Sequence, residues 1–177
     1  MNIVRSLVKF VTDAKPVLRL AELEDGRAAA EGVVRMDENG GLVSPVNGRP
    51  CVAFYYKSFH FTGSRSGQMI PHKLKTEEVY SPFTLELEDG KLAAVPRKSS
   101  NFSAADHKAL SGMGYNGFFA REDLVPAGTR VKLWGKVHRT EEGVVLTYNR
   151  LEVVGISAVS GSDQSKHKKK KKHSKKK

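Results

Sequence analysis

Turn signals at short intervals constrain the fold of this chain more than any other feature. Residues that tolerate positive φ in tight hairpin turns recur between β-forming runs, at residues 24–27, 39–41, 47–48, 88–91 and 141–143. The runs predict strands at residues 17–23, 28–36, 51–61, 82–87, 92–95, 129–139 and 144–156. Many short strands joined by hairpins favour a mainly β domain, a small OB-like, partly closed β-barrel, with a β-sandwich as the alternative.

Two longer stretches lack the strand pattern. Residues 62–78 combine two glycines with Arg65, Lys73 and Lys75, which predicts a mobile, mildly basic hairpin loop. Residues 97–122 are irregular apart from one short helix over residues 103–110, where Ser103 is the expected N-cap of a capping box and a glycine follows the last turn. The run 51–61 is apolar on both faces, so we expect a central strand that is covered on both sides for part of its length.

Residues 1–14 have the period of a short amphipathic helix, which Pro16 ends. This helix could pack on the domain, lie on a membrane surface or bind a partner. The side chains that would make the membrane or partner contact are Ile3, Leu7, Phe10 and Val11 on the apolar side and Arg5 and Lys9 beside them.

Basic charge is concentrated at the C-terminal end. The chain carries a formal net charge of +11, yet residues 1–165 hold 21 Lys and Arg against 19 Asp and Glu, a net charge of +2. Residues 158–177 therefore read as a flexible linker and a disordered poly-Lys tail, after an N-terminal helix (1–16) and a barrel domain (17–157). The expected polyanion-binding residues are Lys166, Lys168, Lys169, Lys170, Lys171, Lys172, Lys175, Lys176 and Lys177. A tethered polycation can bind an anionic lipid surface or nucleic acid, and it can also serve only solubility.

Little in the sequence indicates catalysis. The single cysteine excludes a disulfide framework and a multi-cysteine zinc site, and Cys51 lies in an apolar run where burial raises the pKa of a thiol. A Cys–His nucleophile would need His60 or His138 delivered by the fold. None of the six histidines has metal-ligand spacing, and the glycine-rich segments lack a phosphate loop's lysine. We expect no catalytic residue, metal, cofactor or small-molecule substrate.

An OB-like barrel also raises the possibility of nucleic-acid binding, in which aromatic side chains stack on bases. Most aromatic residues of a domain this size belong to its core. The candidates are Tyr55, Tyr56, Phe59, Phe61, Tyr115, Phe118, Phe119 and Trp134.

Five segments in order resemble one known family. They are residues 31–34, 42–45, 47–55, 81–90 and 124–137, and the best-matched piece is residues 44–52, Ser-Pro-Val-Asn-Gly-Arg-Pro-Cys-Val. Over residues 18–156 the chain is similar to the GIDE domain, also called BAM for "beside a membrane". The resemblance implies a binding or scaffolding domain near membranes, and it carries over no catalytic residue.

The best-known GIDE proteins place the domain between transmembrane helices, ahead of a RING finger with ubiquitin-ligase activity. One cysteine cannot build a two-zinc RING, and no apolar run here is long enough to span a bilayer, so ligase activity is not expected. We expect a cytoplasmic protein, peripheral to a membrane as one option, that acts as a non-enzymatic adaptor. Its barrel would bind a protein partner and its tail a polyanion. The alternative is an OB-like nucleic-acid-binding protein whose barrel aromatics and tail both contact the ligand.

Overall fold

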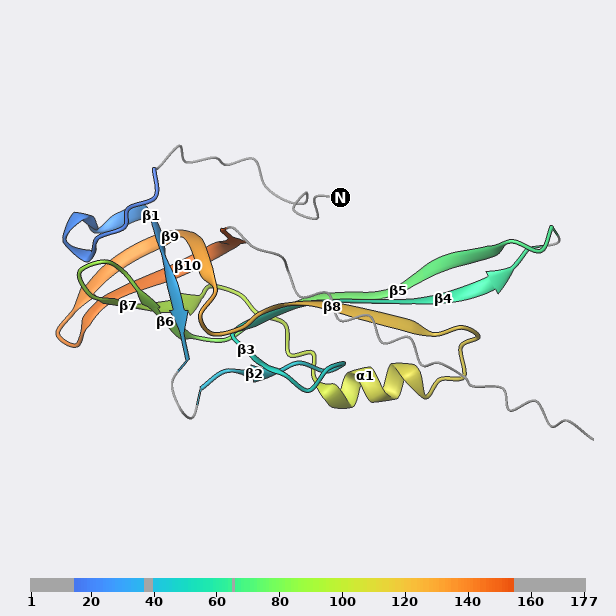
Figure 1. The fold of residues 1–177 in the computed structure, drawn as a ribbon. Coiled ribbons are helices and arrows are strands. Elements are labelled where there is room, and N and C mark those ends of the chain that lie inside the picture. Colours follow the sequence, from blue (N-terminus) through green and yellow to red (C-terminus); the bar gives the residue numbers. More distant parts are fainter. Residues whose placement is uncertain (1–14, 37–39, 65, 155–177) are drawn as a thin grey trace, which may run out of the picture.

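Five strands close a small barrel at one end of the molecule (Figure 1). The computed structural model describes residues 15–36, 40–64 and 66–154. The barrel order is β1-β6-β7-β10-β9, and the strands are β1 (Gly26–Arg35), β6 (Phe83–Glu86), β7 (Lys91–Pro96), β9 (Arg130–Thr140) and β10 (Gly143–Val153). Strands β7 and β10 pair in parallel and every other neighbouring pair is antiparallel. This arrangement confirms the predicted OB-like barrel, which is closed rather than partly closed.

The barrel core follows from alternation along its strands. In β9 the side chains of Val131, Leu133 and Val137 are buried, and in β10 those of Leu146 and Tyr148 are buried against them. The main core therefore occupies the barrel interior, and the intervening side chains point outward.

One glycine lets two barrel strands approach closely. A Cβ at Gly135 of β9 would collide with the Thr147 carbonyl and lie 2.7 Å from the Cα of Tyr148. The β9–β10 register shifts by one residue just beyond this point, between Tyr148 and Arg150. Glycine and bulge together let the sheet curve tightly enough to close.

Long insertions in two barrel connections build a second sheet. Between β1 and β6 lie β2 (Leu42–Val43), β3 (Pro50–Cys51), β4 (Ala53–Gly63) and β5 (Met69–Tyr80). Between β7 and β9 lie α1 (Ala104–Ser111) and β8 (Phe119–Val125). The sheet has the order β5-β4-β8, α1 packs on one of its faces, and a second core between them includes Phe54, Tyr56 and Phe102. Strand β4 is thus central, as predicted, although it belongs to this sheet and not to the barrel.

Helix α1 begins and ends as the sequence predicts. The Ser103 hydroxyl accepts a hydrogen bond from the Asp106 N–H, and the Asp106 carboxylate accepts one from the Ser103 N–H at 2.7 Å. Gly112 is the C-cap residue. The predicted capping box and glycine stop are confirmed.

Two predicted irregular segments are strands. The predicted loop 62–78 contains the end of β4 and most of β5, and β8 occupies the end of the 97–122 stretch. From Met69 to Lys73 every β5 side chain is exposed, so no alternation marks the strand. Its pairing with β4, and not its own hydrophobic pattern, specifies it.

The predicted first strand, residues 17–23, is also wrong. Only Val17 forms a bridge, to Ala30, and Leu20–Glu22 is a short 3₁₀ helix, η1. The Asp89 carboxylate accepts hydrogen bonds from the N–H groups of Leu20 and Ala21, which satisfies the helical donors that a strand would have paired. Within the described ranges, no helix is long and apolar enough to cross a membrane.

Candidate binding surfaces

The hairpin of β4 and β5 extends beyond the barrel (Figure 1). Its cross-strand pairs run from Ala53 and Tyr80 at the root to Gly63 and Met69 near the turn, with one register shift next to Ser58. No β4 residue beyond Ser58 is buried, and Val79 is the only buried residue of β5. The strands therefore leave the core about halfway along their length.

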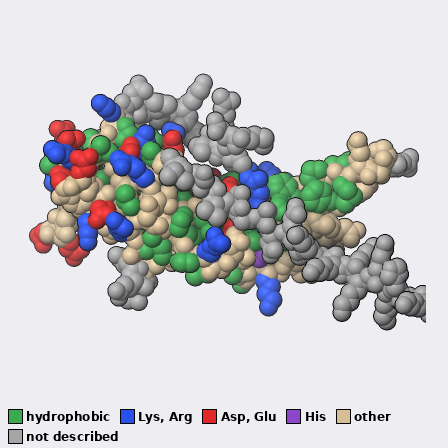
Figure 2. All heavy atoms as spheres, viewed as in Figure 1, with side chains coloured by type: hydrophobic (Ala, Val, Ile, Leu, Met, Phe, Trp, Pro, Cys, Tyr) green, Lys and Arg blue, Asp and Glu red, His purple; other side chains and the backbone are tan. Residues whose placement is uncertain are grey.

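Apolar side chains are exposed near the far end of this hairpin, at the start of β5 and next to the polar connection between the two strands. Met69 is 60% exposed and Ile70 is 44% exposed, and Pro71 beside them is also exposed. Figure 2 shows hydrophobic side chains gathered over the projecting hairpin, whereas acidic side chains in this view gather on the barrel. We call Met69, Ile70 and Pro71 the apolar tip. Clustered exposed apolar residues mark contact surfaces more often than isolated ones do.

Among the described residues, Phe102 and α1 cover one face of the sheet behind the tip, and the side chains of its other face are only half-buried. Tyr56 of β4 contacts Phe102 and His107, so the side chains in step with Tyr56 face α1. The alternate side chains of β4, with Phe119 opposite Phe59 on β8, form what we call the open face: Tyr55, Lys57, Phe59, Phe61 and Phe119. None of these five belongs to either hydrophobic core.

Strand pairing also brings two histidines together. His60 and His72 are cross-strand partners whose rings stack with centroids 5.1 Å apart, and Tyr115 lies 5.2 Å from His60. The Thr62 hydroxyl lies 2.8 Å from Nε2 of His72. His60, Thr62 and Tyr115 line a groove of about 690 Å³ together with Met69. The spacing of His60 and His72 in the sequence does not reveal this contact, because the contact depends on the register between β4 and β5.

The described residues around this pair do not form a metal-binding cluster. Across the described ranges, no group of three or more His, Cys, Asp or Glu side chains is placed to hold a metal ion. His60, which stacks on His72, and Tyr115 form an aromatic and polar wall of the groove, suited to contact with a ligand surface.

Positive side chains surround the projecting half of the sheet. No Asp or Glu occurs in residues 57–76 or 107–121. We call Lys57, Lys73, Lys75 and Arg121 the basic collar. Lys75 pairs with Glu77 at 2.7 Å and Arg121 with Asp123 at 3.7 Å, and both carboxylates lie on the barrel side of the collar. The charge gradient therefore runs from acidic near the barrel to basic near the apolar tip.

Buried polar residues attach the projecting sheet to its surroundings. Glu122 of β8 is only 1% exposed and accepts hydrogen bonds from the N–H groups of Val46 and Asn47. On the same face, the Tyr56 hydroxyl lies 3.0 Å from Nδ1 of His107, and burial lowers the pKa of His107. These bonds hold the 44–48 turn and α1 against the sheet.

Cys51 is buried in the second core next to these groups. Burial, with a smaller effect from the negative charge of Glu122, raises the pKa of its thiol to about 11. Among the described residues no hydrogen bond joins it to a histidine: His60 stacks on His72, and His138 is exposed on β9. The thiol is therefore protonated and shielded at neutral pH.

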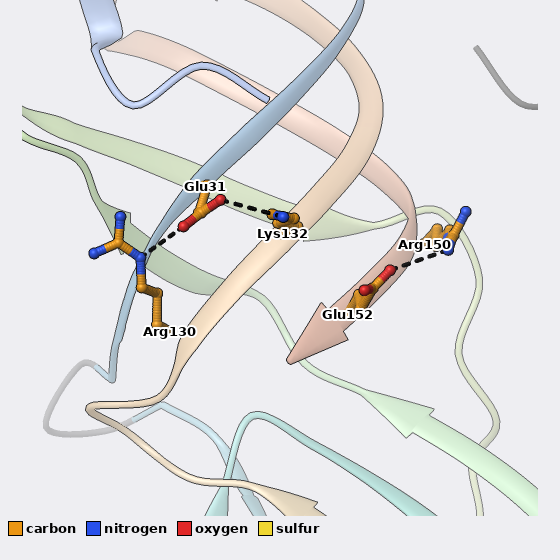
Figure 3. Close-up of polar contacts among 5 residues, drawn as sticks. All are labelled: Glu31, Arg130, Lys132, Arg150 and Glu152. Carbon is orange, nitrogen blue, oxygen red and sulfur yellow. Dashed lines mark hydrogen bonds and ion pairs between the residues drawn. The ribbon is translucent and has the colours of Figure 1, made fainter. Parts of the chain in front are cut away.

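The outer surface of the barrel carries cations that neighbouring carboxylates neutralise. Figure 3 shows Glu31 of β1 between Arg130 and Lys132 of β9, with distances of 2.7 and 3.6 Å. On β10, Arg150 pairs with Glu152 at 3.0 Å (Figure 3). A surface whose cations are paired in this way attracts phosphate groups weakly.

The aromatic residues considered for base stacking fall into different environments. Tyr56 is buried, and Tyr115 is exposed beside the histidine pair. Trp134 lies under the guanidinium of Arg150 at 4.5 Å from the ring centroid, and the ammonium of Lys57 covers Tyr55 at 4.8 Å. Phe118 lies near His107 on the α1 side, which leaves Phe59, Phe61 and Phe119 on the open face.

Two predicted contact regions lie outside the described residues. One is the N-terminal segment with Ile3, Arg5, Leu7, Lys9, Phe10 and Val11. The other is the set of tail lysines 166, 168–172 and 175–177. Their roles stay predictions from sequence.

No known protein family, curated protein or solved structure matches this chain. Its function must be inferred from its own residues and geometry.

Proposed function

We propose that this chain is a non-enzymatic adaptor of GIDE type, in which the barrel is a scaffold, the β5-β4-β8 sheet presents the contact surface, and the C-terminal lysines bind a polyanion. The observation that carries the proposal is the projecting hairpin with exposed Met69 and Ile70 near its end. A scaffold that holds an apolar surface away from its own core is suited to binding.

The segments that resemble the GIDE family support these separate roles of the barrel and the projecting sheet. Two of them meet where the barrel joins the projecting sheet: the Ser81 hydroxyl donates a hydrogen bond to the Val52 carbonyl at 3.2 Å. In the 44–52 segment, Asn47 is fixed by Glu122 through its backbone and its side chain. The resembling residues thus build the junction, as expected for residues that maintain a scaffold.

The chemistry of Cys51 supports a binding role over a catalytic one. A thiol whose pKa is about 11 supplies almost no thiolate nucleophile at neutral pH. Its neighbours in the second core, such as Phe54 and Val79, are apolar, so the side chain acts as a small hydrophobic core residue.

Nucleic-acid binding is the second candidate, and the open face is the observation that favours it. Phe59, Phe61 and Phe119 lie together on one sheet face with Lys57, a combination that single-stranded nucleic acids can bind. The ion-paired surface of the barrel and the near-neutral charge of residues 1–165 weigh against it.

The decisive test compares the full chain with a chain ending at Ser160. Each is assayed for flotation with phosphatidylcholine–phosphatidylserine vesicles and for binding to duplex and single-stranded oligonucleotides over a range of salt. We expect polyanion binding to fall steeply with salt in the full chain, with a log–log slope of about −8 on duplex DNA if all nine lysines bind phosphates. Truncation should weaken polyanion binding and remove this steep dependence on salt.

A different pattern would reverse the ranking of the two candidates. Strong, salt-resistant binding of single strands by the truncated chain would assign the ligand to the barrel or the open face and favour the nucleic-acid function. A chain that starts at Pro16 tests the N-terminal segment. If this shortened chain no longer floats with vesicles, a membrane contact lies in residues 1–15.

A further inference from the structure

We infer that the β4–β5 hairpin is a membrane-docking element, with the apolar tip in the interface of an anionic lipid bilayer and the basic collar at the headgroups. The inference rests on the proposed function and names the polyanion as lipid. The shape, the charge and the strand edge of the hairpin indicate which kind of ligand binds this surface.

The dimensions of the hairpin suit shallow insertion. Met69 and Lys73 are separated by four residues of extended strand, about 13 Å. Apolar side chains at a bilayer surface sit about 5–10 Å into the boundary between headgroups and acyl chains. With Met69 and Ile70 at that depth, the ammonium of Lys73 reaches the lipid phosphates.

The charge distribution selects an anionic surface. Residues 57–76 contain no Asp or Glu, and the carboxylates that act on Lys75 are those of Glu77 and, more weakly, Asp106 of α1. A neutral or cationic partner gains nothing from this arrangement, whereas each lysine near an anionic leaflet is attracted to it. The lysines at the C-terminal end of the sequence would act in the same direction.

The edge of β5 disfavours a strand or a second copy as the occupant. Strand β5 is at the edge of its sheet, and such edges invite pairing with another chain. Here Pro71 lacks an N–H to donate, Lys73 and Lys75 place charges along the edge, and a bulge interrupts the ladder near Ser58. These features block strand addition while leaving the tip side chains free.

The chemistry of the tip disfavours nucleic acid as its ligand. Single-stranded nucleic acids bind by stacking bases on aromatic rings. Met69, Ile70 and Pro71 offer no such ring themselves, although Phe61 of the open face pairs with Pro71, and they partition readily into the interfacial region of lipid.

The test uses the full chain and vesicles of phosphatidylcholine alone or with phosphatidylserine. The variant Met69→Ser/Ile70→Ser removes the tip, and Val43→Ser/Val95→Ser removes two exposed apolar side chains elsewhere as the matched control. We expect the tip variant to bind phosphatidylserine vesicles about tenfold or more weakly than the wild type, because two large apolar side chains no longer leave water. The control should bind like the wild type, and all three should unfold at similar temperatures.

Depth is measured separately with Ile70→Trp. Its emission should shift to shorter wavelength when phosphatidylserine vesicles are added, beyond any change of Trp134 in the wild-type chain. Flotation of the full chain that does not depend on Met69 and Ile70, with no shift for Ile70→Trp, would overturn the inference and leave the tail anchor intact. Failure of the full chain to bind vesicles or nucleic acid at all would instead overturn the proposed function.

Two other outcomes would name a different occupant. If the tip substitutions abolish binding of a single-stranded oligonucleotide and leave flotation unchanged, the hairpin contacts nucleic acid. If they convert a dimer into a monomer in sedimentation experiments and leave flotation unchanged, the hairpin contacts a second copy. Either result contradicts membrane docking.

Discussion

Glu122 accepts two hydrogen bonds from Asn47, one from its backbone N–H at 2.9 Å and one from its side-chain Nδ2 at 2.8 Å. A third donor, the N–H of Val46, reaches the other carboxylate oxygen at 3.2 Å. A buried carboxylate on β8 thus acts as the acceptor for a turn that lies 75 residues earlier in the chain. This contact joins the 44–52 segment to the projecting sheet.

Glu122→Gln should therefore destabilise the fold. The amide can accept through only one oxygen, and its NH₂ group would face a donor, leaving at least one buried polar group unpaired. We expect the free energy of unfolding to fall by about 2 kcal/mol in urea denaturation. The matched control is Glu152→Gln, whose ion pair with Arg150 is exposed and should be worth less than about 1 kcal/mol. Equal effects of the two substitutions would contradict this role of Glu122.

Gly135→Ala should be more damaging than Glu122→Gln. The new methyl group would collide with the backbone of Thr147 and Tyr148 on β10, which cannot move without opening the barrel. We expect a loss of about 3 kcal/mol in the free energy of unfolding, measured by denaturation. Gly63→Ala is the control, because a Cβ there meets open space and the glycine has no positive φ. A well-tolerated Gly135→Ala would mean that the barrel closes more loosely than the β9–β10 contact implies.

Sequence patterns predict the barrel well because its strands alternate. In β7 and β9, buried and outward residues follow each other closely, and hairpin turn signals bound the strands. The α1 capping box is equally local. Each of these signals depends only on neighbouring residues.

The projecting sheet depends on contacts that are distant in sequence. Strand β5 is exposed on both faces from Met69 to Lys73, so the period-two pattern is missing, and the Gly63 and Gly67 signals suggested a loop in its place. The histidine pair and the Glu122–Asn47 contact likewise arise only from pairing. The sequence prediction missed one local signal of the proposed contact surface, the apolar triplet Met69–Ile70–Pro71 within a segment without carboxylates.

Cys51 should resist alkylation in the native state. With the thiol pKa raised from its ordinary 9.0 to about 11, the thiolate fraction at pH 8 falls by about a hundredfold, and burial blocks access as well. Iodoacetamide labelling followed by mass spectrometry should be slow in buffer and fast in urea. Rapid labelling of the folded chain would mean that the second core opens readily.

The raised pKa of the Cys51 thiol also makes the free energy of unfolding depend on pH. Between pH 9 and 11 the unfolded thiol loses its proton and the folded thiol keeps it, so the unfolded state binds fewer protons and stability falls as pH rises. Burial also raises the pKa of Tyr80 and Tyr148, which adds a similar trend at higher pH. Between pH 9 and 11, the free energy of unfolding should therefore fall less steeply in Cys51→Ala than in the wild type.

His107 should make the α1 side of the sheet sensitive to acid. Burial lowers its pKa below the ordinary 6.5, and the ring in its neutral form contacts the Tyr56 hydroxyl through Nδ1. The folded state therefore takes up a proton less readily than the unfolded state. Stability from this residue is present above about pH 6.5 and is lost as the pH falls below that value, because the unfolded state then binds more protons.

The groups that face His107 set the size of this effect. Tyr56 and Phe118 contact the ring, and the negative charge of Glu122 opposes the shift by favouring the protonated form. Urea denaturation at pH 7.5 and pH 5 should show a smaller pH difference for His107→Gln than for the wild type, because glutamine can still accept from Tyr56 but does not titrate. His138→Gln, on the exposed surface of β9, should keep the wild-type difference. A pH difference that His107→Gln leaves unchanged would assign the acid sensitivity to carboxylates elsewhere in the fold.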